Sequence, residues 1–223
     1  MNRLNIAIDG PAGAGKSTVA KQIAVKLGLI YIDTGAMYRA LTWKALQNKV
    51  SITDAAALTK LAAATEVVLS RALTGQLVVR CDGVDVSDAI RTPEVSSHVA
   101  ELASCPGVRR RLVEMQQHMA AQGGVIMDGR DIGSTVLPNA AYKFFLTASL
   151  AERARRRWLE LQASGYQIEY QDLEAEIATR DRQDSNRAVA PLQMAPDAIC
   201  INSDGLNLEQ VIDKILSYIS AEF

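Results

Sequence analysis

The sequence predicts an α/β fold: a five-stranded parallel sheet flanked by helices, with a small antiparallel sheet in an inserted lobe and with a helical lid. Two observations predict this fold. Short runs that are apolar throughout recur between helical patterns, which is typical of parallel strands covered on both faces. One further stretch alternates around an Asp-Gly pair, which is typical of a hairpin. The length of 223 residues suits one domain with insertions.

The strands of the parallel sheet are expected at the apolar runs. In chain order, these runs are Leu4–Ile8, Ile30–Asp33, Val125–Asp128, Tyr142–Leu146 and Ala198–Asn202. Between the first two, Lys16–Leu27 carries its apolar residues on one helical stripe, and Gly28 suits a helix C-terminus. The order strand, helix, strand is that of a parallel sheet.

Two segments do not follow this alternation. The residues from Leu77 to Ile90 alternate over Asp82-Gly83, which predicts a hairpin on a small antiparallel sheet in an inserted lobe. The segment 153–187 is dominated by charged residues at helical spacing and has few large apolar side chains. We therefore expect it to form two exposed helices that move and close over bound ligands.

Composition limits the partners that the protein can have. The chain has 24 basic and 25 acidic residues, a net charge of −1, so no overall field attracts nucleic acid or an anionic membrane. Its three cysteines lie far apart, which fits neither a disulfide framework nor a zinc site. An aspartate at position 9 interrupts the first apolar run, so no signal peptide is expected. We expect a cytoplasmic monomer that acts on small molecules.

A glycine-rich loop follows the first expected strand. The residues Gly10-Pro11-Ala12-Gly13-Ala14-Gly15-Lys16-Ser17 match G-x-x-x-x-G-K-[ST], the phosphate-binding Walker A motif. Glycines leave the backbone N–H groups free to curl around phosphates, and the helix N-terminus adds its positive end. Lys16 is expected to contact the β- and γ-phosphates of ATP, and Ser17 to bind Mg²⁺ directly. An Asn-Lys-x-Asp motif for guanine is absent, which argues against a GTPase. A motor or a helicase would be longer, so a small-molecule kinase remains.

Other strand ends bring arginines to the same edge of the sheet. Arg39 follows the second expected strand, and Arg130 follows the third. Near the end of the charged segment, Arg180, Asp184 and Arg187 are spaced i, i+4 and i+7, which predicts one helical face. Several guanidiniums are what a site needs to bring two anionic phosphates together.

Asp128 ends an apolar strand, as a Walker B carboxylate does. It is expected to hold Mg²⁺ through a water molecule, and the alternative is an aspartate that caps a turn.

The motifs together resemble the bacterial cytidylate kinases, which are P-loop nucleoside monophosphate kinases. The resemblance rests on the glycine-rich loop, Asp33-Thr-Gly-Ala-Met-Tyr-Arg39, Ile90-Arg-Thr-Pro-Glu-Val95, Pro106-Gly-Val-Arg109, Asp128-Gly-Arg-Asp-Ile-Gly133 and Arg187-Ala-Val-Ala-Pro-Leu192. It implies phosphorylation of CMP and dCMP by ATP with Mg²⁺. It also implies a core of residues 1–38, 108–152 and 188–223, an NMP-binding lobe of residues 39–107 and a lid of residues 153–187.

The resemblance also implies roles for individual residues. ATP would contact the loop residues Gly10 to Ser17, Thr18, Arg153 and Arg157. The CMP phosphate would be held by Arg39, Arg130 and Arg187, and Thr34 would also bind the substrate. Arg109 and Asp131 would recognise cytosine, while Arg180 and Asp184 would hold the sugar. Lys16, Asp128, Arg130 and Arg187 would be the catalytic residues.

The sequence departs from the family at two places near the expected base site. Ala100 stands where a serine is common, and Gln116-Gln117 stands where a Gln-Arg pair is expected. Two alternatives remain open. One is a kinase for UMP, AMP or shikimate, against which Arg109 and Asp131 argue. The other is a P-loop switch without enzymatic activity, against which the acceptor-side arginines argue, because a switch has no second anion to hold.

Overall fold

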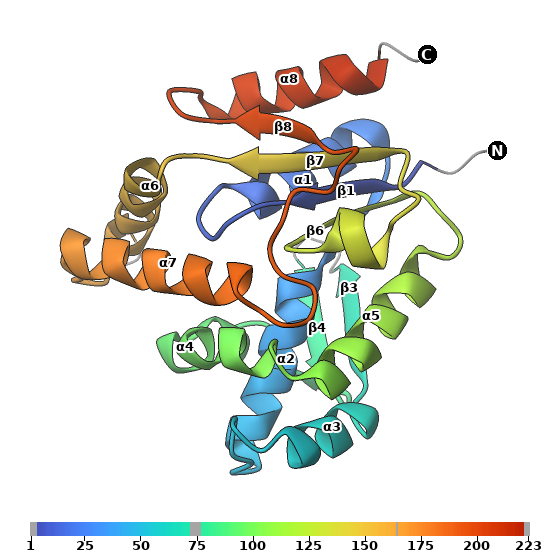
Figure 1. The fold of residues 1–223 in the computed structure, drawn as a ribbon, viewed down its shortest axis with the longest axis vertical. Helices are drawn as coiled ribbons and strands as arrows, with labels where there is room; N and C mark the ends of the chain where they lie inside the picture. Colours follow the sequence, from blue (N-terminus) through green and yellow to red (C-terminus); the bar gives the residue numbers. More distant parts are fainter. Residues whose placement is uncertain (1–3, 72–76, 164, 221–223) are drawn as a thin grey trace. The chain divides into compact units, whose positions relative to one another are not determined.

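The computed structural model describes residues 4–71, 77–163 and 165–220 (Figure 1). The chain divides into two compact units, Met1–Tyr31 with Gln122–Phe223, and Ile32–Ala121. This division differs from the boundaries expected from the sequence. Residues 32–38 and 108–121 group with the lobe instead of the core, and the lid residues 153–187 group with the core.

The first unit contains most of a parallel sheet and the helices around it. Its elements are β1 (Ile6–Asp9), α1 (Lys16–Leu27), β2 (Ile30–Asp33, which crosses the unit boundary), β6 (Val125–Gly129), the π-turn η2 (Ile132–Val136), β7 (Tyr142–Thr147), α6 (Leu150–Ala163), α7 (Tyr170–Ser185), β8 (Ile199–Asn202) and α8 (Leu208–Ser220). The five-stranded sheet has the order β2-β6-β1-β7-β8. Strand β1 pairs in parallel with both β6 and β7, and β7 pairs in parallel with β8.

The expected strands and the first helix are confirmed, with strand ends that shift by one or two residues. The helix Lys16–Leu27 has the predicted bounds. Gly28 caps it with φ +65°, and the Gly28 N–H donates to the Ala24 carbonyl. The positive φ explains why glycine ends this helix, because a side chain is unfavourable in that conformation.

The core of the first unit lies between the sheet and two helices. Ile6 and Ile8 of β1 join one apolar cluster with Phe144 of β7 and with α1 and α8. Ala7 and Asp9 alternate with these isoleucines, so they face the other side of the sheet. There the backbone of η2 packs against β1 and β6. The carboxyl ends of β1 and β6 therefore emerge side by side, in the register Asp9 to Gly129.

The second unit joins helices to a small antiparallel sheet. Its elements are α2 (Thr34–Gln47), α3 (Ala55–Ala63), β3 (Val67–Arg71), β4 (Leu77–Cys81), β5 (Val84–Asp85), the 3-10 turn η1 (Ala89–Arg91), α4 (Pro93–Leu102) and α5 (Pro106–Ala120). The sheet has the order β3-β4-β5, and both pairings are antiparallel. The predicted hairpin is confirmed. Strand β3 was not predicted, and it forms part of this sheet by pairing with β4.

The charged segment forms two helices, α6 and α7, as expected, although α6 starts earlier, at Leu150. The two helices pack on each other through Ala154, Leu173 and Ile177, with Trp158 against this small cluster. The expected helical face of Arg180, Asp184 and Arg187 is wrong at its last member. Helix α7 ends at Ser185, so Arg187 lies beyond it.

We predict that replacing Gly28 with Ala lowers the free energy of unfolding by about 1 kcal/mol, because Ala must adopt a left-handed conformation there. No atom lies within 4 Å of an added Cβ, so the effect comes from backbone conformation alone. Urea denaturation followed by circular dichroism measures it. Gly28→Asn is the matched variant, and we expect a smaller loss because Asn tolerates this conformation. Equal stability of the wild type and Gly28→Ala would contradict the assignment.

Candidate active site

The glycine-rich loop joins β1 to α1. Gly10 opens the loop at φ +148°, and a Cβ there would lie 2.0 Å from the backbone oxygen of Leu146. The loop therefore passes too close to β7 for any side chain at this position. Lys16, the first residue of α1, is buried, and its ammonium donates to the Pro11 carbonyl at 2.7 Å. The loop thus curls around its own lysine.

Positive charge surrounds Lys16. Burial and then the nearby Arg130 guanidinium hold the pKa of Lys16 well below its usual value, with Arg180 acting in the same direction and Asp128 opposing it. Cations placed this close repel one another, so an anion that binds among them is strongly stabilised.

Ser17 and Asp128 meet beside the loop. The Ser17 hydroxyl donates to Asp128 Oδ2 at 2.7 Å, and the Tyr31 hydroxyl donates to Asp128 Oδ1 at 2.8 Å. Because the Ser17 proton points toward the carboxylate, the lone pairs of its oxygen remain available for a cation. Hydroxyl and carboxylate oxygens are the hard ligands that Mg²⁺ prefers. The pair expected from the sequence is therefore brought together, and Tyr31 was not predicted.

Asp9 is a second residue that the sequence analysis missed. Its buried carboxylate accepts the backbone N–H groups of Ile132 at 2.8 Å and of Gly133 at 2.7 Å. Asp9 precedes the glycine-rich loop, and Ile132 follows Asp131, so one carboxylate joins the segments that carry the two groups of predicted residues. The signal was an aspartate at the end of an otherwise apolar strand.

Three expected acceptor-side residues meet in the first unit. Arg130 Nε donates to Asp184 Oδ2 at 2.7 Å, and Arg187 donates from Nη2 to Asp184 Oδ1. Burial alone would raise the pKa of Asp184, but Arg130 and then Arg187 outweigh it and hold that pKa below its usual value. Arg180 acts on Asp184 in the same direction.

The chain itself supplies negative charge among these arginines. In the structure, the carboxylate of Asp184 lies between Arg130 and Arg187 and supplies that negative charge. With 1% of its surface exposed, Asp184 is paired and desolvated, so its removal would leave these cations uncompensated.

Helix α7 also contacts the glycine-rich loop. Asp181 accepts the N–H of Ala12 at 3.3 Å and pairs with Arg153 at 2.6 Å. Arg153 in turn donates to the Ala12 carbonyl at 2.9 Å and to the Ala148 carbonyl at 3.0 Å. Arg153, expected to contact ATP, therefore lies at the loop and holds its backbone.

The neighbouring arginines of α6 behave differently from one another. Arg157, also expected to contact ATP, pairs with Glu160 at 2.8 Å, and 41% of its side chain is exposed. Arg156, to which the sequence analysis gave no role, donates to the hydroxyl of Ser203 at 3.0 Å and to its carbonyl at 2.7 Å. It fastens α6 to the segment after β8, and its helical spacing gave no signal of this.

The second unit carries three further predicted substrate residues, Thr34, Arg39 and Arg109. Asp33 caps α2 by accepting the Ala36 N–H at 2.8 Å, and its carboxylate also pairs with Arg39 at 3.2 Å. Thr34, the first residue of α2, is buried.

Arg109 is also buried in this unit. It donates to the Ala103 carbonyl at 3.3 Å, with its guanidinium carbon 5.7 Å from the centre of the Tyr38 ring. The two departures from the family pattern also lie here. Ala100 is buried in α4 and Gln116 in α5.

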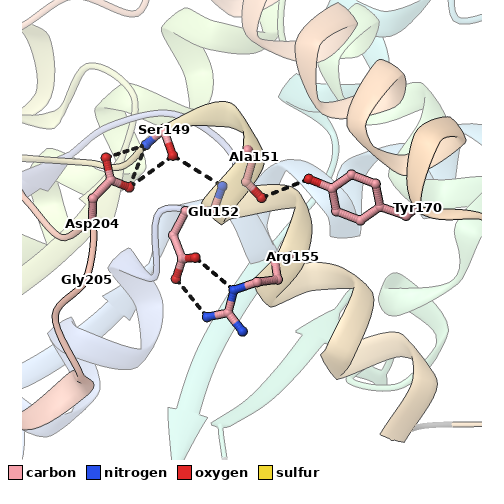
Figure 2. Close-up of a pocket in the computed structure, with 7 residues that line it drawn as sticks. All are labelled: Ser149, Ala151, Glu152, Arg155, Tyr170, Asp204 and Gly205. Carbon is pink, nitrogen blue, oxygen red and sulfur yellow. Dashed lines mark hydrogen bonds and ion pairs between the residues drawn. The ribbon is translucent and has the colours of Figure 1, made fainter.

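A pocket of about 560 Å³ opens beside the N-terminus of α6 (Figure 2). Asp204 accepts the N–H of Ser149 at 2.9 Å, and Tyr170 donates to the Ala151 carbonyl at 3.1 Å. Arg155 holds the pKa of Glu152 at about 2. None of the residues predicted for the site lines this pocket, and these polar groups bind one another. It is not the centre of the predicted chemistry.

Among the described residues, His, Cys, Asp and Glu form no group of three or more that could hold a metal ion. A site with Ser17 and Asp128 would need phosphate oxygens and water as its other ligands. In the part of the chain that the structure describes, no helix is long and apolar enough to cross a membrane.

Comparison with known proteins gives the family. The cytidylate kinase profile matches residues 6–221. The chain belongs to the cytidylate kinase family. A cytidylate kinase from Desulfitobacterium hafniense is 53% identical over 214 residues, covering 96% of this chain and 91% of that protein. A cytidylate kinase from Symbiobacterium thermophilum is 54% identical over 215 residues, covering 96% and 95%.

Solved structures support the fold. A shikimate kinase from Acinetobacter baumannii is 14% identical, with a TM-score of 0.50 over 99% of this chain and 95% of that chain. At this identity the likeness shows the fold alone. The expected P-loop kinase fold and the resemblance to cytidylate kinases are both confirmed.

We predict that Asp9 makes stability depend on pH. Burial raises the pKa of Asp9 from 3.8 to about 6, although hydrogen bonds from Gly133 and Ile132 lower it. The nearby Asp131 also raises this pKa, and Lys16 lowers it. The folded state therefore binds this proton more tightly than the unfolded state. The stabilisation is complete below pH 3.8 and is lost as the pH rises through about 6. The difference in unfolding free energy between wild type and Asp9→Asn should fall by about 1.4 kcal/mol between about pH 5 and pH 7.5.

Urea denaturation of both proteins at each pH measures this difference. A difference that does not change with pH would show that Asp9 does not titrate in this range.

Proposed function

We propose that this protein transfers the γ-phosphate of ATP to CMP and dCMP, which forms CDP and dCDP. Membership of the cytidylate kinase family supports the reaction. The observation that carries it is the hydrogen bond from Ser17 of the glycine-rich loop to Asp128, next to the buried Lys16, together with the Arg130, Asp184 and Arg187 cluster in the same unit. One side is suited to a donor triphosphate, and the other is suited to an acceptor phosphate.

The chemistry needs positioning and charge stabilisation more than acid–base catalysis. An oxygen of the CMP phosphate attacks the γ-phosphorus of ATP, and the bond to the bridging oxygen breaks with its electron pair left on ADP. The attacking oxygen is already anionic, so no strong general base is required. Lys16 balances charge on the donor, and Arg130 with Arg187 balances charge on the acceptor and on the phosphoryl group in transfer.

The donor set fits the expected metal. A magnesium ion bound with ATP would neutralise charge on the β- and γ-phosphates, held directly by Ser17 and through water by Asp128. The 2.7 Å hydrogen bond between these two side chains supports this assignment. In addition, the loop residues Gly10 to Thr18, Arg153 and Arg157 would contact ATP.

We extend the family motifs to the acceptor. Arg39, Arg130 and Arg187 would bind the CMP phosphate, and Thr34 would also bind the substrate. Arg109 and Asp131 would recognise cytosine, and Arg180 with Asp184 would hold the sugar. Kinases for UMP, AMP or shikimate are not favoured, and neither is a switch without activity, because relatives that are 53% and 54% identical are cytidylate kinases.

The protein would act as a monomer in the cytoplasm. Its near-neutral net charge supports action on small molecules rather than on nucleic acid or membranes.

We predict that Lys16→Met lowers kcat by about a hundredfold or more. Methionine keeps the length of the side chain but lacks the ammonium that balances charge on the phosphoryl group in transfer. A coupled assay of ADP release with CMP measures the rate. Lys26→Met, on an exposed position of the same helix, is the matched control and should keep full activity. Near wild-type turnover by Lys16→Met would exclude the proposed role of the loop.

We predict that kcat/KM for CMP exceeds that for UMP by at least about tenfold. Cytosine offers an amine where uracil offers a carbonyl. A carboxylate that accepts a hydrogen bond from the amine would have no donor when it faces the uracil carbonyl. The same assay with CMP, dCMP, UMP and AMP measures the preference. Equal use of CMP and UMP would refute the assignment of Arg109 and Asp131.

A further inference from the structure

Tyr31 of β2 places its hydroxyl in the site without appearing in any of its motifs. The side chain is buried, with 3% of its surface exposed, and its hydroxyl donates to Asp128 Oδ1 at 2.8 Å. A buried phenol needs a hydrogen-bond partner, and most find one in the backbone or in water. Here the partner is a carboxylate that the proposed function gives to the metal.

The two oxygens of Asp128 are held from two different elements. Ser17 of α1 donates to Oδ2 at 2.7 Å, while Tyr31 of β2 donates to Oδ1. The terminal torsion of an aspartate is broad, so the side chain alone does not define the plane of its carboxylate. Two donors on opposite oxygens define that plane.

Helix α1 also holds the ring of Tyr31. The Lys21 ammonium lies 5.6 Å from the centre of the ring, one helical turn after Ser17. This contact restricts the ring from the same helix that carries the other donor to Asp128. Tyr31 is therefore linked to helix α1 both through its ring and through Asp128, so its side chain does more than fill the core.

We propose that Tyr31 is a positioning residue that orients the carboxylate of Asp128 for the magnesium ion bound with ATP. The inference rests on the proposed function, because it requires the metal role of Asp128. Partners that orient a metal-binding carboxylate commonly change metal affinity by tenfold or more when they are removed. Tyr31 acts through Asp128, so its removal should weaken the magnesium-dependent part of ATP binding and leave the rest.

A buried tyrosine elsewhere in the same unit provides a matched control. Tyr142 of β7 is 7% exposed, and its hydroxyl donates to the carbonyl of Ile219 at 3.3 Å. Tyr31→Phe and Tyr142→Phe each delete one buried hydroxyl and keep the ring. A purely structural role of Tyr31 would make the two variants behave alike toward magnesium.

The experiment measures ATP affinity by isothermal titration calorimetry, once with magnesium chloride and once with EDTA. For each protein, the ratio of the two affinities gives the gain that magnesium provides. We expect this gain to fall by about tenfold in Tyr31→Phe and to stay at the wild-type value in Tyr142→Phe. Affinity in EDTA should be unchanged in Tyr31→Phe, which shows that the variant is folded and that its phosphate loop is intact.

Asp128→Asn separates failure of this inference from failure of the proposed function. If Asp128→Asn loses the gain from magnesium while Tyr31→Phe keeps it, the metal role stands and the role of Tyr31 is overturned. If Asp128→Asn itself keeps the gain, the proposed metal role falls, and the inference falls with it. A loss in Asp128→Asn and in Tyr31→Phe, but not in Tyr142→Phe, supports both.

Discussion

At the end of β1, the buried carboxylate of Asp9 accepts two backbone N–H groups from the turn that follows β6. The next residue, Gly10, begins the glycine-rich loop, and the turn begins just after Arg130 and Asp131. The position of the donor loop relative to these two residues therefore depends on one carboxylate. Parallel pairing of β1 with β6 brings the strand ends to one edge of the sheet, and Asp9 ties the segments beyond them together.

The site in the first unit also depends on the balance of charges within it. Four cations contribute to its electrostatics: Lys16, Arg130, Arg180 and Arg187. Without negative charge nearby, the repulsion among them would oppose folding. Asp184 supplies negative charge at the arginines, and Asp181 supplies it at Arg153 beside the loop. Both aspartates come from α7, so the charged helix compensates the site that it covers. A bound nucleotide phosphate would enter an environment in which cations are already oriented, which lowers the free energy needed to assemble them.

The sequence predicted those parts of the site that are encoded locally. Lys16 and Ser17 belong to a continuous motif, and Asp128 ends a run whose apolar character marks a buried strand. Arg187 and Arg156 show where helical spacing was insufficient. Helix α7 ends before Arg187, and Arg156 contacts Ser203, far away in the chain. Periodicity describes the faces of a helix, but it does not identify which segment will pack against a given face.

The sequence by itself determined the five parallel strands, the phosphate loop and the family, because each is marked by short continuous runs of residues. Only the tertiary structure decided which hydroxyls hold Asp128, which carboxylate lies among the arginines and which backbone groups Asp9 accepts. In the sequence alone, Tyr31 looks like one more residue of a buried strand. Its hydroxyl gains a partner 97 positions away through sheet pairing, since hydrogen bonds of buried polar groups are satisfied by the whole fold.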